Sequence, residues 1–201
     1  STSNTGINFT RSSDCTISGG NHVAVSGTLE IIGNNTDVNN LVTITAASNK
    51  RHFYLNGVNN KLILHFIKLT GGNVSSYNTN PDKLGGSICI FEGGTLLLYK
   101  SVIANNKAAI GGGIFGYGNV NNMNAIIINI NGTSMMKNEA FGFGGGMALQ
   151  WVVLSMVESN VSSNTCSEKG GGMALTESRS ILQKSVINRN TADEGGGMYI
   201  N

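Results

Sequence analysis

The segment GGGMALQWVVLSMVESNVSSNTCSEKGGGMALT, residues 144–176, contains the six residues GGGMAL twice, 26 positions apart. Glycine triplets followed by Ile or Met also begin at Gly111 and Gly195, and a degenerate copy, GGSI, begins at Gly85. From Ile88 onward, the apolar residues after these glycines lie 26, 33, 26 and 25 positions apart. A recurring unit of this length predicts an architecture in which each unit stacks on its neighbours.

Asparagines recur in step with the triplets. Asn105, Asn138 and Asn164 each precede the first glycine of a triplet by six residues, and Asn190 precedes it by five. A short apolar segment precedes each asparagine, as at residues 102–103. One unit therefore consists of an apolar strand, an Asn turn, a few polar residues, a glycine triplet and a second apolar strand.

The apolar segments have the period of β-strands. After the triplets, the trios MAL (147–149) and MYI (198–200) place their first and third residues on one face of an extended chain. The other apolar runs are short and rich in branched side chains, which also favours strands. Three glycines within a helix would cost about 1 kcal/mol each relative to alanine, which excludes helical repeats.

We therefore predict an all-β fold: a single right-handed parallel β-helix of about 25 residues per coil, with a pectin-lyase-like architecture. Glycine suits a corner that needs a positive φ or close backbone approach, and stacked asparagines can hydrogen-bond amide to amide along the axis. The residues expected in these stacked turns are Gly111, Gly112, Gly113, Gly144, Gly145, Gly146, Gly170, Gly171, Gly172, Gly195, Gly196, Gly197, Asn105, Asn138, Asn164 and Asn190.

The repeat divides the chain unevenly. Residues 1–40 are expected to form an N-terminal cap and the first coils, and residues 41–201 the coils of one continuous domain. Longer spacings predict loops at residues 73–83 and 116–124. Because Asn201 lies just past the last triplet and bare strand edges favour pairing, we expect the last coil to dock onto a further segment or another copy.

Composition excludes several classes of protein. The 201 residues include 28 Gly and 28 Asn, and only 12% are charged, about half the usual share. Hydrophobic residues make up 40%, which is enough for a core. A net charge of +2 gives no basic stripe for nucleic acid, and no apolar run approaches the ~20 residues of a membrane helix. Three scattered cysteines predict neither a disulfide scaffold nor a zinc cluster, and we expect no cofactor.

Units such as SVIANNKAAIGGGI (101–114) and SVINRNTADEGGGM (185–198) resemble the repeats of polymorphic outer membrane proteins, and the resemblance covers about residues 85–201. Those repeats pair F-x-x-N and G-G-A-[ILV] motifs on a right-handed parallel β-helix. This chain has Gly where the second motif has Ala, and the positions of the motif's Phe hold Val102, Met135, Val161 and Ile187. The resemblance implies a surface-displayed adhesin or structural passenger rather than an enzyme.

A polysaccharide lyase or hydrolase is the alternative, since many parallel β-helices act on acidic polysaccharides. Such sites need converging carboxylates, with calcium or a basic side chain nearby. The best candidate group is Glu139, Glu168 and Asp193 or Glu194, which precede successive triplets. A solvated turn that also carries Lys169 is the simpler interpretation of these residues.

Three smaller features of the sequence bear on an acidic-sugar site. The NTD string at residues 35–37 matches one element of polygalacturonases, but the other elements are missing. Residues 50–52 (Lys-Arg-His) with His65 are a candidate basic patch for an anionic sugar. His22 stands alone, and a structural role is expected for it.

A glycan-binding module is a further alternative. It would need a row of exposed aromatic side chains, for which Phe115, Tyr117 and Tyr199 are candidates although they do not form a ladder in the sequence. Five sequons, about as many as chance gives, offer candidate N-glycosylation sites: Asn8, Asn34, Asn73, Asn131 and Asn160.

The favoured function is therefore non-catalytic: an extracellular or cell-surface structural or adhesive β-helix, such as a filament or surface-layer building block. Low charge, abundant amides and a self-stacking backbone suit such a surface. The partners expected are other copies or segments of the same assembly, together with glycans.

Overall fold

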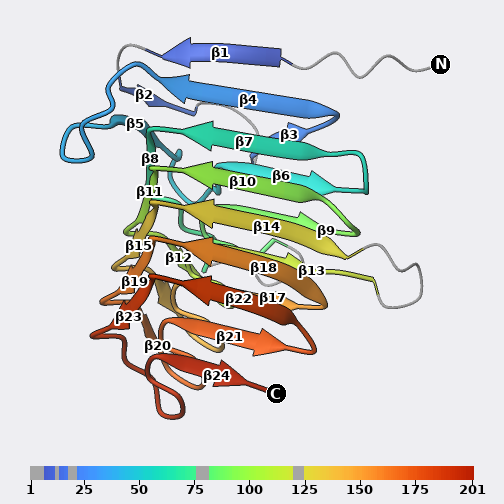
Figure 1. The fold of residues 1–201 in the computed structure, drawn as a ribbon, viewed down its shortest axis with the longest axis vertical. Coiled ribbons are helices and arrows are strands. Elements are labelled where there is room, and N and C mark those ends of the chain that lie inside the picture. Colours follow the sequence, from blue (N-terminus) through green and yellow to red (C-terminus); the bar gives the residue numbers. More distant parts are fainter. Residues whose placement is uncertain (1–6, 12–13, 18–21, 76–81, 120–124) are drawn as a thin grey trace.

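The computed structural model describes residues 7–11, 14–17, 22–75, 82–119 and 125–201 (Figure 1). Within these residues, every regular element is a β-strand and every strand pair is parallel. The strands stack as a β-solenoid of about 6 turns, with about 29 residues per turn. The predicted all-β parallel architecture is confirmed.

Four sheets run along the stack. Sheet A has the order β1 (Ile7–Arg11), β4 (Thr28–Gly33), β7 (Lys61–His65), β10 (Thr95–Tyr99), β14 (Ile126–Asn131), β18 (Val152–Val157) and β22 (Arg179–Gln183). Sheet B has β2 (Cys15–Thr16), β5 (Val42–Thr45), β8 (Ile67–Thr70), β11 (Val102–Ala104), β15 (Ser134–Met136), β19 (Asn160–Ser162) and β23 (Val186–Asn188). Sheet C has β3 (Val23–Val25), β6 (Phe53–Asn56), β9 (Ile88–Phe91), β13 (Ile114–Tyr117), β17 (Met147–Gln150), β21 (Met173–Thr176) and β24 (Met198–Ile200). Sheet D has β12 (Lys107–Ala108), β16 (Glu139–Ala140) and β20 (Thr165–Cys166).

The three turns that contain a strand of sheet D pass through the sheets in the order A, B, D and C, as in β14, β15, β16 and β17, and the other turns pass from B directly to C, as in β7, β8 and β9. Residues of neighbouring turns that face each other are 26 positions apart in the later coils but 32 or 34 apart in earlier ones. The extra residues of the earlier coils lie between β8 and β9 and between β13 and β14. The 25-residue period predicted from the sequence therefore describes the C-terminal coils, and the average turn is longer.

The core is a set of stacked apolar columns. Ile88, Ile114, Met147 and Met173, the residues that follow the glycines, pair in register through sheet C and are fully buried. Equivalent inward residues of sheets A and B belong to the same continuous core. Strand β1 pairs with β4, so it belongs to the same stack as the later coils.

The glycine triplets lie at the corner before sheet C. Gly112 donates its N–H to Gly144 O, and Gly145 donates to Gly170 O, so successive triplets are stacked. The first glycine of each triplet has a positive φ, which is 64° at Gly144. The second faces the next coil: a Cβ on Gly145 would lie 2.3 Å from Gly171 O. The triplet therefore meets two requirements, a left-handed turn and close approach of backbones.

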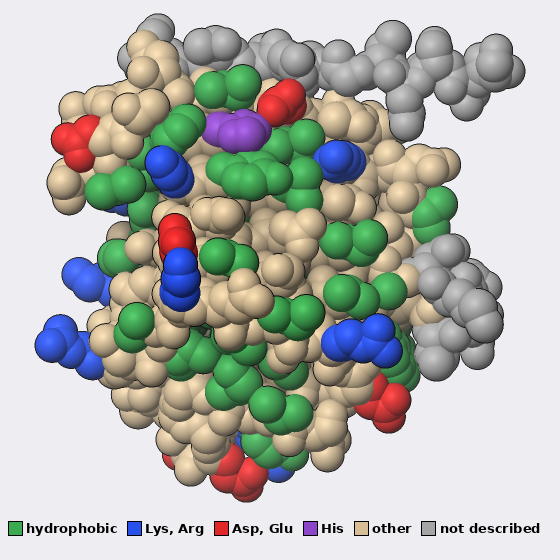
Figure 2. All heavy atoms as spheres, viewed as in Figure 1, with side chains coloured by type: hydrophobic (Ala, Val, Ile, Leu, Met, Phe, Trp, Pro, Cys, Tyr) green, Lys and Arg blue, Asp and Glu red, His purple; other side chains and the backbone are tan. Residues whose placement is uncertain are grey.

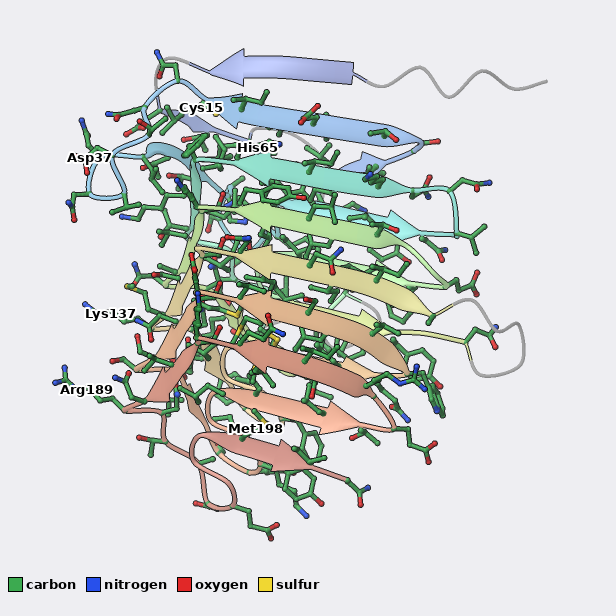
Figure 3. All side chains as sticks on the ribbon, viewed as in Figure 1. Cys15, Asp37, His65, Lys137, Arg189 and Met198 are labelled. Carbon is green, nitrogen blue, oxygen red and sulfur yellow. The ribbon has the colours of Figure 1, made fainter. Side chains whose placement is uncertain are left out.

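Other corners use residues with side chains in the left-handed region. Positive φ occurs between sheets A and B at Phe66, Lys100, Glu158 and Lys184, and between sheets B and D at Asn105 and Lys137. Arg189 has a positive φ directly after β23 of sheet B. Lys137 and Arg189 project from the same edge of the molecule (Figure 3). Positive φ alone therefore does not demand glycine here, although it strains most residues. The triplets demand it because their neighbours are backbone atoms.

An asparagine ladder runs through Asn106, Asn138 and Asn164, which are buried, and Asn190, which is partly buried. The backbone N and Nδ2 of Asn138 both donate to Asn164 Oδ1, at 2.9 and 3.0 Å, and Asn106 and Asn164 repeat this pattern with the next residue of the ladder. The sequence-based prediction that Asn105 is the first member of this ladder is wrong. Strand pairing aligns Ala104 with Met136, so Asn106 rather than Asn105 reaches the ladder, and Asn105 occupies the exposed corner with φ 56°.

A second ladder, which the sequence argument missed, joins sheets A and B. Ser101 N donates to Thr133 Oγ1 at 3.2 Å, Thr133 N to Ser159 Oγ at 3.1 Å, and Ser159 N to Ser185 Oγ at 3.2 Å. The corner N–H groups of successive coils are thus satisfied by hydroxyls of the following coil. The signal was present in the sequence, since Ser101 and Ser185 begin the two quoted SVI units.

Candidate binding groove on sheet C

A groove of about 790 Å³ runs along the outer face of sheet C. It extends from Tyr54 and Asn56 on β6 to Tyr199 on β24 and Asn201. Successive strands of a sheet lie ~4.8 Å apart, so six strands give a groove about 24 Å long, parallel to the stack. We call this surface the sheet C groove.

Strict register arranges the outward side chains of sheet C in two columns along this groove. One column contains Tyr54, Cys89, Phe115, Ala148, Ala174 and Tyr199. The other contains Asn56, Phe91, Tyr117, Gln150 and Thr176. Each coil therefore adds one residue to each column, and residues distant in sequence become neighbours.

Aromatic side chains line the N-terminal half of the groove. The ring centroids of Tyr54 and Phe91 are 6.0 Å apart, those of Phe91 and Phe115 5.6 Å, and those of Phe91 and Tyr117 6.1 Å. Tyr117 also meets Trp151 edge to face at 5.1 Å. These spacings are within the range of favourable aromatic contacts, so this half is an ordered apolar wall.

In the C-terminal half, the floor of the groove holds two alanines, each about 5% exposed. Ala148 and Ala174 occupy consecutive positions of the first column, between Phe115 at one end and Tyr199 at the other. Three coil steps separate those two aromatic positions, about 14 Å at ~4.8 Å per coil. Because alanine contributes only a methyl group, the sheet surface between them is left as a recess, which we call the alanine slot.

The slot has a charged wall on one side. Lys169 Nζ lies 3.1 Å from Glu194 Oε2, 3.4 Å from Tyr199 Oη and 4.7 Å from the centre of the Tyr199 ring. The hydrogen bond to Glu194, followed by the one to Tyr199, raises the pKa of Lys169, so its ammonium stays charged. Ile110 and Phe143 form the rest of this wall.

The opposite wall is polar. Gln150 and Thr176 lie in the second column of outward residues, and beyond them Trp151 Nε1 donates to Glu177 Oε2 at 3.3 Å. A recess with an apolar floor, aromatic ends and a few amide and hydroxyl groups has the composition typical of small-ligand sites.

The three aromatic candidates named from the sequence all line this groove. Phe115 and Tyr117 lie on β13, and Tyr199 lies three strands away on β24. The sequence argument missed Tyr54, Phe91, Trp151 and Lys169. Their signal was weak because one aromatic residue per coil has meaning only when the strand register is known.

The acidic group proposed from the sequence does not form. Glu139 lies on sheet D, where its carboxylate is 2.7 Å from Lys107 Nζ, whereas Glu194 pairs with Lys169 beside sheet C. Glu168 aligns with Gly142 and Glu194 through backbone hydrogen bonds. Glu168 and Glu194 therefore lie on neighbouring coils as expected, whereas Glu139 lies on sheet D, so the three carboxylates do not converge.

The predicted basic patch at residues 50–52 is also wrong. Arg51 is 2% exposed and His52 is fully buried. Arg51 Nη2 donates to Asp82 O at 2.6 Å, and its guanidinium lies 5.8 Å from the Tyr54 ring centre. His65 lies on sheet A instead, hydrogen-bonded to Glu30 at 2.8 Å (Figure 3).

His52 has a structural role inside the solenoid. Its Nε2 is 3.0 Å from Ile44 O and 3.1 Å from Thr70 O, and its Nδ1 is 3.0 Å from Ser87 Oγ. Burial lowers the pKa of His52 to about 4, against the opposing effect of the two carbonyls. The ring is therefore neutral in the folded protein at neutral pH, with Nε2 as the proton donor to a carbonyl.

This pKa makes folding stability depend on pH. The folded state resists protonation of His52 while the unfolded state takes up a proton near pH 6.5, so stability is fully present above pH 6.5 and falls as the pH decreases toward 4. We expect a loss of about 3 kcal/mol over that window. His52→Gln, whose amide can still donate to the carbonyls, should lose this part of the pH dependence. Urea unfolding of both proteins at several pH values measures it, and equal slopes would contradict the assignment.

The remaining sequence candidates are structural. The His22 ring lies 4.9 Å from the Tyr54 ring, and burial, followed by the charge of Arg51, lowers its pKa. In the NTD string, Asn35 Oδ1 accepts from Asp37 N, and Asp37 Oδ1 accepts from Asn39 N. Asp37 lies on an exposed loop away from the groove (Figure 3). These hydrogen bonds are those of Asx turns.

No metal site is evident in the part of the chain that the structure describes: no group of three or more His, Cys, Asp or Glu side chains is placed to hold an ion. The three cysteines are free. Burial raises the pKa of the Cys89 thiol to about 12, so it is protonated and unreactive beneath the aromatic cluster. Among the described residues, no helix is long and apolar enough to cross a membrane.

The sequons differ in exposure. Asn34 and Asn131 are exposed, while Asn73 and Asn160 are partly buried. Asn73 Oδ1 accepts from both the N–H and the hydroxyl of Ser75, which occupies its side chain. Asn8 lies on β1. Glycosylation stays a prediction, with Asn34 and Asn131 the more accessible acceptors.

The outer face of sheet A is the other broad surface. Figure 2 shows its hydrophobic side chains lying among polar and charged ones, and the exposed residues there include Ile127, Val153 and Ile181. His65 stacks on Tyr99 at 4.8 Å on this face. Ile127 and Val153 are register neighbours on this face, but no lined recess like the sheet C groove is described there.

Comparisons with protein-family models, with curated proteins and with solved structures found no match to this chain. Its geometry nevertheless defines the class of fold, a parallel β-solenoid. The likeness of residues 101–114 and 185–198 to polymorphic outer membrane protein repeats stays an interpretation of the sequence.

Proposed function

We propose that this chain is a non-catalytic binding protein of the extracellular or cell surface, in which stacked coils form a rigid scaffold and the sheet C groove is the contact surface. The observation that carries the proposal is the groove itself, with its aromatic wall and its alanine slot on one face of the solenoid. Sites on the strands of a rigid scaffold are held more accurately than sites on loops.

The acids beside the groove favour binding over cleavage. Glu92 and Glu177 lie at the same corner between sheets C and A, but in coils three steps apart, which is about 14 Å at ~4.8 Å per coil. Paired carboxylates of glycosidases are about 5 to 9.5 Å apart. Glu177 is also engaged by the Trp151 indole. These two carboxylates are therefore badly placed to act as an acid/base pair.

The surface setting is proposed from composition and from the repeat. A chain with 12% charged residues and 28 asparagines presents amides rather than charges, which suits an adhesive or structural surface. The resemblance to polymorphic outer membrane protein repeats supports the same setting. Association with further copies or segments of one assembly belongs to this proposal.

The proposal is tested by blocking the groove. Labelled protein is applied to immobilised polysaccharides and to cell surfaces, and the same polysaccharides are incubated with it, with and without calcium, to detect cleavage products. We expect binding without products, and at least tenfold weaker binding for Ala174→Trp, whose indole would fill the slot. Ile127→Trp, on the outer face of sheet A, is the control and should bind like the native chain. Release of saccharide products would overturn the non-catalytic assignment.

A further inference from the structure

We infer that the alanine slot takes a neutral linear glycan whose chain runs along the solenoid axis; this inference rests on the proposed function and names its ligand. Two consecutive coils contribute only a methyl group each, at Ala148 and Ala174, and the next outward residues of that column are aromatic at both ends. The recess thus spans the three coil steps between Phe115 and Tyr199 and has two alanine methyl groups on its floor.

The repeat of the slot matches the repeat of a sugar polymer. Equivalent positions of neighbouring coils are ~4.8 Å apart, and a pyranose in an extended chain advances by nearly the same length per residue. A linear glycan lying along the stack therefore places one ring over Ala148 and the next over Ala174. A compact ligand would leave most of the groove, which continues past Phe91 and Tyr117, unused.

The lining suits the two kinds of surface that a sugar ring presents. Its C–H faces pack against aromatic and methyl groups, which here come from Tyr117, Tyr199 and the two alanines. Its hydroxyl edge needs donors and acceptors, which Gln150 and Thr176 supply from the second column. Apolar floor and polar edge lie side by side, as a pyranose requires.

Charge complementarity favours a neutral chain. The charged groups that line the groove are Lys169 and Glu92, and Lys169 is already neutralised by Glu194 at 3.1 Å. An acidic polymer would have to displace Glu194 and would gain no second cation from the lining. For a neutral sugar, the Lys169 ammonium remains a hydrogen-bond donor at the edge of the slot.

The backbone excludes an added peptide strand on this face. Strands β13, β17 and β21 pair on both sides within sheet C, so their N–H and C=O groups are used along the stack. A peptide bound by strand addition needs an unpaired edge. A proline-rich peptide, which needs only aromatic contacts, is retained as a competing outcome of the test.

The test is calorimetric titration of the whole chain with neutral linear hexasaccharides (cellohexaose, xylohexaose, chitohexaose), with hexagalacturonate and with a proline-rich decapeptide. We expect at least one neutral hexasaccharide to bind, with its disaccharide at least tenfold weaker. Gln150→Ala at the slot edge should weaken binding about tenfold, and Ala174→Trp should abolish it. Near-ultraviolet circular dichroism checks that each variant is folded. If Ala174→Trp does not fold, Gln150→Ala alone tests the slot.

The outcomes separate the two proposals. The neutral glycan is overturned if the chain prefers hexagalacturonate or the peptide. It is also overturned if no neutral hexasaccharide binds while groove-dependent binding to cells persists. Both results leave the proposed function standing. Neutral glycan binding that Gln150→Ala and a folded Ala174→Trp leave unchanged overturns the slot as its site. If, in addition, binding to cells does not depend on the groove, both proposals are overturned.

Discussion

Replacing Gly145 by alanine is expected to destabilise the solenoid by at least about 4 kcal/mol, a large part of the ~5–15 kcal/mol that stabilises a folded protein. The added Cβ would lie 2.3 Å from Gly171 O and 2.6 Å from Thr165 O, both in the backbone of the next coil. Neither oxygen can move away without breaking the parallel pairing that joins β17 to β21. The substitution therefore forces two coils apart instead of displacing a flexible side chain.

Gly142 supplies the matched control, three residues earlier on the same coil. A Cβ there would have Ala109 O as its nearest neighbour, at 3.4 Å, which is ordinary contact. Gly142→Ala should change the free energy of unfolding by about 1 kcal/mol or less. Guanidinium unfolding followed by far-ultraviolet circular dichroism compares the two variants. Equal stability of Gly145→Ala and the native chain would show that the triplets are not in backbone contact.

The second large effect is expected at the asparagine ladder. Asn138→Ala removes the acceptor of both Asn106 N and Asn106 Nδ2, and the donor to Ile103 O at 3.0 Å. Each buried group left without a partner costs about 1–3 kcal/mol, so we expect a loss of about 3–5 kcal/mol. The same unfolding measurement gives this value.

Asn105→Gly is the control for the ladder, because Asn105 has φ 56° and an exposed side chain that is not part of it. Glycine accepts this φ without strain, so stability should change by no more than about 0.5 kcal/mol. If Asn105→Gly were as damaging as Asn138→Ala, the ladder would pass through Asn105, as its distance from the triplet suggested, and the register of β11 and β15 would be wrong.

The contrast between Asn105 and Asn138 shows which features of the fold could be predicted from the sequence. Triplets and alternating apolar residues predicted the parallel β-helix because both depend on local geometry that every coil repeats. Asn105 and Asn106 are adjacent, and only the pairing of Ala104 with Met136 decides between them. The constant distance to the triplet predicted Asn105 in place of Asn106, because the connection from the ladder to Gly111 is one residue shorter than the one to Gly144.

The groove was less predictable than the fold. Phe115 and Tyr199 are 84 residues apart in sequence, and only stacking places them at the two ends of one slot. Ala148 and Ala174 carry no chemical signal, yet their small size creates the recess. Conversely, Arg51 and His52 looked accessible because they are polar, whereas hydrogen bonds to Asp82, Ile44 and Thr70 carbonyls allow them to be buried.

The central claim, that sheet C is the contact face, is tested most directly by nuclear magnetic resonance with labelled alanine methyl groups. The chain is titrated with the hexasaccharide that binds best, and every alanine methyl is followed. We expect the Ala148 and Ala174 methyls, on the floor of the slot, to shift in proportion to occupancy. Ala104 and Ala140, which lie on sheets B and D and do not line the groove, should stay unchanged. Saturable binding that leaves Ala148 and Ala174 unshifted would contradict the account.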